Sequence, residues 1–573
     1  MEQTGEAKNV PSELDLQFDA ITQVVTGPGG PLEATTGERG ALTAAKLPAT
    51  LPQMLDLFCG LHRETVAVIA GDEQLTFGEI GMAAHAAAEA LVGAHGVKPG
   101  DRVAIAMRNA PAWIACYMAV LKAGGIATLI NGWWERGELA HALKLTDPAL
   151  VLADSARAKR IADAGWTGRV VVLPVERPIA EALALLGEGA GATIPQLQPE
   201  MDATILFTSG STGDAKGAVS THGAVTAAVY NFAAAIGTVG ALLEKRRGGP
   251  SPHPIRALIG IPFFHVTGAV PLMLLSFVIG RGMVLMPKWD AGEALRLIEE
   301  HRVTYFLGVP TMSLELSTHA DRGKHDLSSL TDIAAGGAPR PVAHVQRLRD
   351  TMKPAQPGLG YGLTETNAAG CTNFWENYVD KPASTGRAQP FVEIAIVDEA
   401  RRPLPPSEVG EVAIRTRANV RGYWRNEEAT AKAFTPDGWF HTGDLGYLDE
   451  DGYLFIVDRI KDIIIRGGEN ISAAEVESAI YQHPDVAEVS VFGLDCERLG
   501  EVPGAVMHLQ PGRALDHDGL VGFLEGKLAR FKVPARLWLH DEPLPKLGTG
   551  KIDKVSLRAR YRRQLNADAS QGA

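Results

Sequence analysis

Cysteine is scarce in this sequence, with four residues among 573, at positions 59, 116, 371 and 496. They form no CxxC pair and match no zinc-site spacing, which excludes a cysteine-based zinc site and favours a reducing, intracellular compartment. Positive charge is also in short supply, because 55 Lys and Arg stand against 67 Asp and Glu, a net charge of −12. That balance provides no basic surface, so no nucleic-acid partner is expected.

An uninterrupted hydrophobic run long enough to cross a membrane is lacking as well. The nearest candidate lies between Arg256 and Arg281, where no Asp, Glu, Lys or Arg occurs, but four residues break it: Pro262, His265, Gly268 and Pro271. The pattern predicts buried elements, namely a strand at 257–261, a turn, a short helix at 271–279 and a strand at 283–286. Acidic residues precede any apolar run at the N-terminus, which argues against a secretory signal. A cytoplasmic protein without a transmembrane segment is expected.

The length predicts two or more domains. Residues 1–47 are polar and without periodicity, so we expect an extension that is partly ordered at best. Over residues 48–458, short β-rich runs alternate with helical patterns, which predicts layered sheets and helices of the α/β class. Residues 459–573 contain a capping-box pattern, Ser472 to Glu475, between short strands. They predict a small α+β domain.

One loop is rich in Gly, Ser and Thr. An apolar strand at 205–207 runs into Thr208-Ser-Gly-Ser-Thr-Gly-Asp-Ala-Lys216. Its hydroxyls, backbone N–H groups and single cation suit phosphate oxygens. It is not a Walker A loop, because Ala215 precedes the lysine and Gly217 follows it. Taken alone, the segment is equally compatible with a flexible surface loop.

Three further segments combine glycine with reactive side chains. The segment 358–366 offers an aromatic ring, hydroxyls and a carboxylate suited to Mg²⁺, although its glycines lack the dinucleotide-binding spacing. Asp444, a carboxylate suited to ribose hydroxyls, precedes Arg459-Ile-Lys461-Asp462 by fifteen residues. The segment 545–551 presents a lysine on a glycine loop. Each is compatible alone with a turn, a charged linker or a tail loop, but chance does not explain all four together.

In this order, and with Phe263-Phe-His265 and Gly336-Gly-Ala-Pro339 between them, the segments resemble the adenylate-forming superfamily. That superfamily contains acyl-CoA synthetases, peptide-synthetase adenylation domains and luciferases. The resemblance covers residues 55–558 and departs at Ala215, where the family usually has proline. It implies a large N-terminal adenylate-forming domain and a small mobile C-terminal domain. It also implies two steps: the acid attacks the α-phosphorus of ATP, and the thiol of coenzyme A then displaces AMP.

The resemblance implies a role for each matched residue in the first step. Lys551 would bridge the acid and the α-phosphate, Thr364 would contact that phosphate, and Glu365 would hold Mg²⁺; with His265 they form the catalytic set. The other ATP and AMP contacts would be Thr208, Ser209, Gly210, Ser211, Thr212, Gly213, Lys216, Gly337, Ala338, Pro339, Tyr361, Asp444 and Arg459.

For the second step, the resemblance implies rotation about Lys461, which brings Gly467 and Gly468 to the site as CoA-binding residues. His265 is expected at the acyl pocket, either as a gate or as a packed core residue. The other expected pocket residues are Val266, Gly268, Gly336, Gly360, Asn367 and Ala368. None is charged, which favours a hydrophobic acid: a medium- or long-chain fatty acid first, an aryl or ring acid as the alternative.

Other functions remain open at this point. An adenylating enzyme can also serve a carrier-protein thiol, although Gly467-Gly-Glu-Asn470 resembles the CoA-ligase version and no carrier module is expected after Ala573. A non-catalytic relative would lack the lysine or carboxylates that are present here, and a P-loop kinase would release ADP. We expect ATP, Mg²⁺ and CoA as cofactor and co-substrates, a small carboxylic acid as partner, and leave a homodimer open. Trp133 and Trp134 receive no role.

Overall fold

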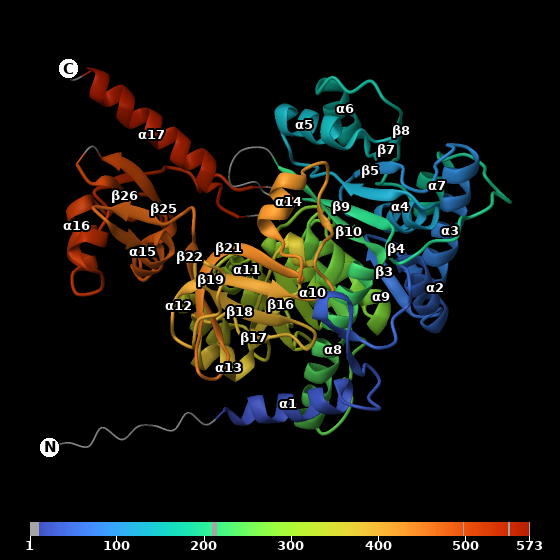
Figure 1. Ribbon diagram of the computed structural model, residues 1–573, viewed down its shortest axis with the longest axis horizontal. Coiled ribbons are helices and arrows are strands. Elements are labelled where there is room, and N and C mark those ends of the chain that lie inside the picture. The colour runs from blue at the N-terminus through green and yellow to red at the C-terminus, as the bar shows by residue number, and fades with distance from the viewer. Residues whose placement is uncertain (1–10, 209–214, 497, 548–550, 572–573) are drawn as a thin grey trace.

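Two large sheets dominate the N-terminal part of the molecule (Figure 1). The structure, a computed structural model, describes residues 11–208, 215–496, 498–547 and 551–571, with side chains to residue 565. Within this part of the chain, the strands form a two-stranded sheet and larger sheets of seven, nine, four and five strands. The five-stranded sheet belongs to a smaller C-terminal domain, which lies at the left of Figure 1.

The seven-stranded sheet carries the ends of the loop at residues 208–216, the predicted phosphate loop. Its order is β20 (Gly422–Tyr423), β10 (Lys216–Thr221), β9 (Asp202–Thr208), β6 (Ile126–Leu129), β5 (Arg102–Ala106), β7 (Leu150–Ala153) and β8 (Val170–Val172). The strands from β9 to β8 run parallel, whereas β10 and β20 are antiparallel to their neighbours. Lys216 pairs with Thr208 across β10 and β9, so the loop begins and ends at one point of the sheet edge.

The nine-stranded sheet carries the other nucleotide motifs. Its order is β17 (Arg387–Ala388), β16 (Gly370–Phe374), β15 (Gln356–Gly362), β14 (Asp332–Gly336), β13 (Tyr305–Gly308), β11 (Arg256–Ile259), β12 (Gly282–Leu285), β3 (Val66–Ala70) and β4 (Glu73–Thr76). The strands from β15 to β3 are parallel, and Gly336 pairs with Gly360. Both motifs therefore leave the sheet at its carboxyl edge, where α/β proteins bind ligands.

Helices cover these sheets and fill the space between them. In chain order they are α2 (Leu51–Leu61), α3 (Phe77–Gly93), α4 (Pro111–Lys122), α5 (Arg136–Thr146), α6 (Ser155–Asp163), α7 (Ile179–Ala184), α8 (His222–Arg247), a π-helix (Gly268–Leu274), α9 (Leu275–Ile279), α10 (Ala291–Glu300), α11 (Pro310–Thr318), α12 (Val342–Thr351), α13 (Trp375–Asp380) and α14 (Glu427–Ala433). Short 3₁₀ turns lie at Glu38–Gly40, Arg322–Lys324, Thr364–Thr366 and Arg530–Lys532.

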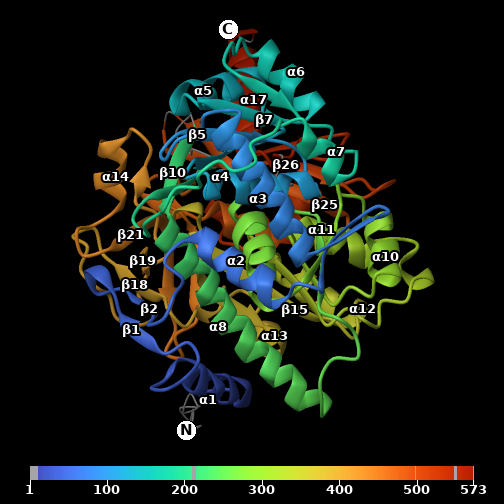
Figure 2. The ribbon, with the colours of Figure 1, turned by 90° about the vertical axis from the view of Figure 1, so that its right-hand side faces the viewer.

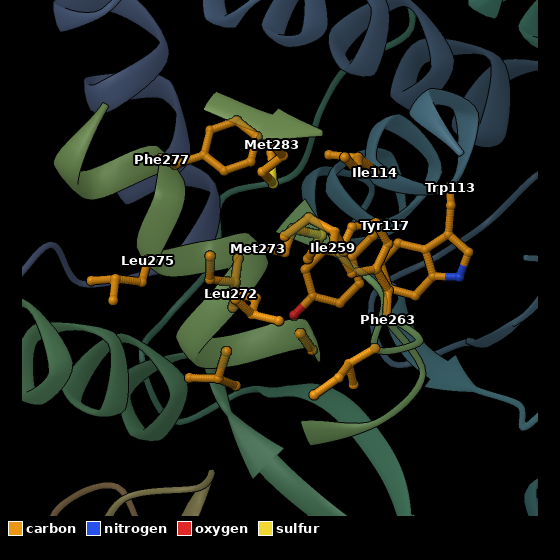
Figure 3. Packing of buried hydrophobic residues seen from close by; sticks show 14 of the residues in the cluster. Trp113, Ile114, Tyr117, Ile259, Phe263, Leu272, Met273, Leu275, Phe277 and Met283 are labelled. Atoms are coloured by element: carbon orange, nitrogen blue, oxygen red, sulfur yellow. The ribbon is translucent and has the colours of Figure 1, made fainter. Parts of the chain in front are cut away.

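The main core forms around α4, every residue of which is buried. Trp113 stacks on Tyr117 with ring centroids 5.5 Å apart and lies 5.2 Å from Phe263 (Figure 3). Apolar residues from β11, the π-helix and β12 surround these rings. A helix that is apolar on all sides is stable only when it is enclosed in this way.

The apolar stretch between Arg256 and Arg281 is part of this core, as predicted. It forms β11, the π-helix with α9, and β12, and the residues of these elements are almost all buried. By length and composition, α8 is the one helix within the described residues that could cross a membrane, yet 61% of its apolar window is buried. It contacts α1, α2 and α9 and is a core helix (Figure 2).

Residues 11–47, the described part of the expected N-terminal extension, form regular structure. They form α1 (Glu13–Thr26), β1 (Ala34–Thr36) and β2 (Leu42–Ala44), and α1 packs on α8 (Figure 2). The buried Asp15 accepts hydrogen bonds from Tyr453 Oη at 2.9 Å and Asn377 Nδ2 at 3.0 Å, and pairs with Arg387. Leu14, Phe18 and Ile21, at helical spacing, also pack in a hydrophobic cluster with Leu242 and Trp375. That spacing is the signal from which the helix could have been predicted.

A four-stranded sheet joins the two domains: β18 (Glu393–Val397), β19 (Gly410–Arg415), β21 (Trp439–Leu448) and β22 (Leu454–Arg459). The C-terminal domain follows with β23 (Ile464–Arg466), β24 (Glu469–Ile471), α15 (Ala473–Ile480), β25 (Val486–Cys496), β26 (Gly500–Leu509), α16 (His517–Leu524), β27 (Arg536–Leu539) and α17 (Lys554–Gln571). Ser472 caps α15 by accepting from the Glu475 N–H at 3.0 Å, as its pattern predicts. A separate hydrophobic cluster, beginning at Ile464, stabilises this domain.

Candidate active site

Asp444 is the centre of the nucleotide side of the site. It lies on β21 opposite Arg459 of β22, and its carboxylate contacts Arg459 Nε at 3.1 Å. Tyr361, at the end of β15, donates its hydroxyl to the same carboxylate at 2.7 Å. Burial raises the pKa of Asp444, and Arg459 and Tyr361 oppose that shift. Two motifs that are far apart in sequence thus meet in one hydrogen-bonded group.

Glu365 lies in the 3₁₀ turn Thr364–Thr366 that follows β15. Its carboxylate is 9% exposed and accepts a hydrogen bond from the Tyr423 hydroxyl at 2.8 Å. Burial raises the pKa of Glu365. The Lys216 ammonium lies 5.0 Å from the centre of the Tyr423 ring, a cation–π contact. Tyr423 therefore connects the expected metal ligand with the expected phosphate lysine.

The surroundings of Glu365 determine how the site can bind a metal ion. Within the described residues, no group of three or more His, Cys, Asp and Glu side chains is placed to hold a metal ion. Mg²⁺ is usually held by one or two carboxylates together with substrate phosphates. A single buried carboxylate beside a phosphate lysine fits that mode of binding, so Glu365 is a suitable ligand.

Lys551 of the C-terminal domain reaches into the large domain at Gly337. A β-carbon on residue 337 would lie 3.2 Å from Lys551 Cε and 3.3 Å from Nζ, so any side chain there would crowd the lysine. Gly337 also has a φ of +77°, which favours glycine. Burial and the nearby Arg459 lower the pKa of Lys551 to about 8, and Asp444 opposes them. The lysine thus lies beside the ribose group of residues.

His265 is half-buried in the turn after β11. Burial, with a smaller effect of Lys551, lowers its pKa to about 3, so the imidazole is neutral at physiological pH. Its Nδ1 accepts from the Thr267 N–H at 3.3 Å, which leaves the proton on Nε2. The neutral imidazole of His265 therefore adds no positive charge to that of Lys551.

The other residues expected at the acyl pocket differ in their surroundings. A β-carbon on Gly360 would meet no atom closer than 4.0 Å, and one on Gly336 none closer than 3.4 Å. At Gly268 a β-carbon would lie 2.2 Å from the Pro262 carbonyl oxygen, so this glycine permits close backbone packing in the π-helix. A β-carbon would therefore fit at the two strand glycines but not at Gly268.

Two further residues expected at the pocket belong to the packed interior. Val266 is 3% exposed, and Asn367 is fully buried. The amide of Asn367 accepts from Ser220 Oγ at 3.0 Å and donates to the Ala418 carbonyl at 2.8 Å. Ala368 follows with a φ of +67°. Both ends of the Asn367 amide are thus engaged by protein groups.

With this geometry in place, the chain can be compared with known proteins. A sequence profile described as AMP-binding enzyme matches residues 56–424, and one described as AMP-binding enzyme C-terminal domain matches residues 475–551. This chain belongs to the AMP-binding enzyme family. The resemblance inferred from its motifs is thereby confirmed.

Individual proteins are similar to this AMP-binding enzyme over most of its length. Feruloyl-CoA synthase of Amycolatopsis sp is 34% identical over 501 residues, 86% of this chain and 96% of that protein. Long-chain-fatty-acid–CoA ligase of Bacillus subtilis is 33% identical over 498 residues, 81% and 86% of the two chains. The solved o-succinylbenzoate CoA synthetase of Bacillus subtilis, in complex with its acyl-adenylate, has a TM-score of 0.76 at 30% identity and covers 89% of this chain and 98% of that one.

These comparisons confirm the predicted α/β fold with a separate C-terminal domain, and the class of AMP-forming acyl-CoA ligases. The same synthetase has been solved with ATP and magnesium ion, at a TM-score of 0.75 and 30% identity over 88% of this chain and 99% of that one. ATP, Mg²⁺ and coenzyme A are thus confirmed as the cofactor and co-substrates of this class.

The remaining predicted residues of the enzyme are placed as follows. Thr208 and Lys216 are the paired ends of the phosphate loop, whereas Ser209, Gly210, Ser211, Thr212 and Gly213 lie outside the described residues. Ala338 and Pro339 follow Gly337 on the loop after β14. Gly467 and Gly468 form the exposed turn between β23 and β24, with φ values of +60° and +91°. Lys461 lies between β22 and β23.

Two residues of this enzyme's site escaped the sequence analysis. Tyr423 belongs to no motif, and only its pairing with Ala218 through β20 and β10 brings it to Glu365. Arg340 is buried, and it donates to the Gly358 carbonyl at 3.2 Å and to Ser313 Oγ at 3.3 Å. It anchors the loop that contains Gly337. Its position directly after Gly336-Gly-Ala-Pro339 was the available signal.

Proposed function

We propose that this enzyme converts a hydrophobic carboxylic acid without a second charge into its acyl-adenylate and then into its CoA thioester. The observation that carries this proposal is Lys551, which enters the space left by Gly337 beside Asp444 and Arg459. An ammonium at this point suits the meeting of two anions, the acid and the α-phosphate.

In the first step, an oxygen of the acid carboxylate attacks the α-phosphorus, and the bond to the β-phosphate breaks. Both reactants are negative, so catalysis consists of positioning and charge stabilisation. Lys551 lies between them and Thr364 contacts the α-phosphate, while Lys216 holds the β- and γ-phosphates. Asp444 and Arg459 hold the ribose, and Tyr361 orients Asp444 through the 2.7 Å hydrogen bond. When bound at Glu365, Mg²⁺ supplies charge neutralisation for the leaving pyrophosphate.

In the second step, the thiolate of CoA attacks the acyl carbonyl, and the bond to the AMP phosphate breaks. We place the domain boundary at residues 458 and 459 and the hinge of the small domain at Lys461. Rotation there withdraws Lys551 and brings the turn of Gly467 and Gly468 to the site. The absence of side chains at this turn allows a narrow pantetheine arm to approach the backbone.

We infer the class of acid substrate from the residues expected at the acyl pocket. The neutral His265 offers no cation to a second carboxylate, and the space beside Gly336 and Gly360 borders no charged side chain of the predicted set. A medium- or long-chain fatty acid is our first choice. An aryl acid is the alternative, because feruloyl-CoA synthase and a long-chain-fatty-acid ligase are similar to this chain to nearly the same degree.

A panel of acids tests this proposal. The purified enzyme is incubated with ATP, Mg²⁺ and CoA, and with octanoate, dodecanoate, palmitate, benzoate, ferulate or a dicarboxylate. We expect AMP, pyrophosphate and a thioester, with the highest kcat/KM for an uncharged hydrophobic acid. ADP as product, or a clear preference for the dicarboxylate, would contradict the proposal. Acyl-adenylate without thioester would favour transfer to a carrier-protein thiol.

We further propose a cytoplasmic location. All four cysteines are free thiols, which suits a reducing compartment. Light scattering of the purified enzyme measures whether the homodimer left open by the sequence forms.

A further inference from the structure

Asp458 connects the two domains. Its backbone belongs to β22 of the large domain, where it pairs with Leu445 of β21. Its side chain is 7% exposed and lies against the C-terminal domain. The carboxylate accepts a hydrogen bond from Ser472 Oγ at 2.9 Å and another from the Ala474 N–H at 3.1 Å. Ser472 Oγ also lies 2.9 Å from the Val457 carbonyl oxygen.

The groups that receive Asp458 suit a negative charge. Ser472 and Ala474 form the N-terminus of α15, where free N–H groups and the helix dipole favour a carboxylate. The half-buried Lys554 ammonium lies nearby and pairs with Glu477 at 2.7 Å. Burial disfavours a charge on Lys554. Glu477, together with Asp458 and Asp462, nevertheless raises the pKa of Lys554 and keeps the ammonium charged. The large-domain carboxylate is therefore stabilised by groups of the small domain.

The proposed hinge at Lys461 lies between Asp458 and Ser472 in the chain. Ser472 and Ala474 move with the small domain, whereas Asp458 stays in β22. The hydrogen bonds between them form in the orientation that also places Lys551 beside Gly337. Two longer contacts also join parts of the chain on either side of Lys461: Lys546 lies 3.7 Å from Glu315, and the ring centroids of His344 and Tyr481 are 6.0 Å apart.

We propose that Asp458 is a positioning residue for adenylation: through Ser472 and the N-terminus of α15, it stabilises the orientation in which Lys551 reaches the site. This inference rests on the proposed function, because it assumes that the small domain rotates about Lys461 between the two steps. Rotation breaks both hydrogen bonds. Asp458 therefore stabilises one of the two states and acts on the first half-reaction alone.

Half-reaction kinetics test this role. Acyl-adenylate formation from ATP and acid is measured in a single turnover, and thioester formation is measured from supplied acyl-adenylate and CoA. Asp458→Asn and Ser472→Ala are expected to slow the first reaction by about three- to tenfold, the value of a helix-terminal charge or one charge-assisted hydrogen bond. The second reaction should stay unchanged or become faster. Ser472→Thr, which keeps the hydroxyl, should restore the first rate.

Asp516→Asn is the matched control. Asp516 caps α16 by accepting from the Gly519 N–H at 2.8 Å, so it is a helix-capping carboxylate within the small domain. Its substitution should lower thermal stability as much as Asp458→Asn does, without separating the two half-reactions. Equal slowing of both half-reactions by Asp458→Asn would show a merely structural role and overturn the proposal.

A distance measurement provides a second test that does not depend on turnover. Spin labels are placed at Val342 of α12 and Leu539 of β27, which are 42% and 52% exposed, in a Cys496→Ser background. Asp458→Asn should reduce the population at the wild-type distance and increase the second population. An unchanged distance distribution would overturn the proposal about Asp458, whatever the activity of the enzyme. Failure of the wild type to form acyl-adenylate would instead contradict the proposed function.

Discussion

Lys551 lies against Gly337, where a β-carbon would crowd its ammonium. Its ammonium is buried beside Arg459, and these two effects bring its pKa down to about 8. A lysine in this state gives up its charge easily before ATP binds and holds it firmly once phosphates surround it. The readiness of the free enzyme for adenylation therefore depends on whether Lys551 is protonated at a pH near 8.

The pH dependence of adenylation follows from this pKa. As pH rises through about 8, free Lys551 loses its proton, so kcat/KM for ATP should fall above that value. The kcat should persist to higher pH, because bound phosphates favour the ammonium. In the unfolded chain the pKa is 10.5, so the folded state binds fewer protons between about 8 and 10.5 and stability should rise with pH there.

Lys551→Arg is the control for that profile. Arginine keeps its charge at every accessible pH, so the decline in kcat/KM above pH 8 should disappear even if the rate is lower. Steady-state kinetics from pH 6 to pH 10 measure both enzymes. A decline that persists in Lys551→Arg would assign the titration to another group.

Gly360 makes a separate prediction for the acyl chain. Because a β-carbon on residue 360 would meet no atom closer than 4.0 Å, Gly360→Val should fold normally and fill part of the expected acyl pocket. We expect kcat/KM for palmitate to fall by about tenfold or more while that for octanoate changes by less than about threefold, since a pocket methylene is worth about 1 kcal/mol or more. Gly268→Val, which would collide with the Pro262 carbonyl, should instead lower stability. An equal loss for both acids in Gly360→Val would place the chain elsewhere.

At the scale of single elements, the sequence predicts strands well where burial is simple. The strands expected at 257–261 and 283–286 are β11 and β12, with ends that differ by one or two residues. The helix expected at 271–279 begins earlier as a π-helix, because Gly268 allows the chain to approach the Pro262 carbonyl. The helix at residues 13–26 was missed, although Leu14, Phe18 and Ile21 form an apolar stripe at helical spacing. Tyr423 was missed because only sheet pairing brings it to Glu365.

The docking of α1 predicts a stability effect. Asp15 is 6% exposed and is held by Tyr453, Asn377 and Arg387. Asp15→Ala leaves these groups without their carboxylate, and should lower the free energy of unfolding by about 2–3 kcal/mol. Asp19→Ala is the matched control: it also pairs with Arg387, but its side chain is 48% exposed, so the loss should stay below about 1 kcal/mol. Urea titration followed by tryptophan fluorescence measures both; equal losses would contradict the role of the buried cluster.

For the whole molecule, the motifs predicted two domains, but not which orientation they adopt. The structure shows the orientation in which Lys551 reaches Gly337, and a second orientation is required only by the proposed CoA step. Lys551→Ala should therefore slow acyl-adenylate formation by about 10²–10³-fold. Thioester formation from supplied acyl-adenylate should be nearly unchanged, because the lysine has then been withdrawn. Equal loss in both half-reactions would contradict this division.

Lys461→Pro should have the opposite effect. Proline fixes φ near −65° and restricts the preceding residue, so it limits rotation between β22 and β23. No hydrogen bond from the Lys461 N–H is found within the described residues, whereas Ile460 and Asp462 donate to Gly443 and Arg459 at 3.0 and 2.9 Å. Proline therefore removes no bond of the adenylation orientation. We expect adenylation within about threefold of wild type and thioester formation reduced by about tenfold or more, because the domain movement becomes limiting.

Lys461→Ala separates the loss of rotation from the loss of the side chain. Alanine keeps the backbone freedom of residue 461, so both half-reactions should stay close to wild type. If Lys461→Ala impairs thioester formation as strongly as Lys461→Pro, the lysine side chain, and not the rotation, is needed for the second step. If neither variant has an effect, the pivot lies elsewhere in the segment between Arg459 and Ile464 that connects β22 to β23. The contact of Asp458 with Ser472 spans that segment, so it would oppose rotation about any of its bonds.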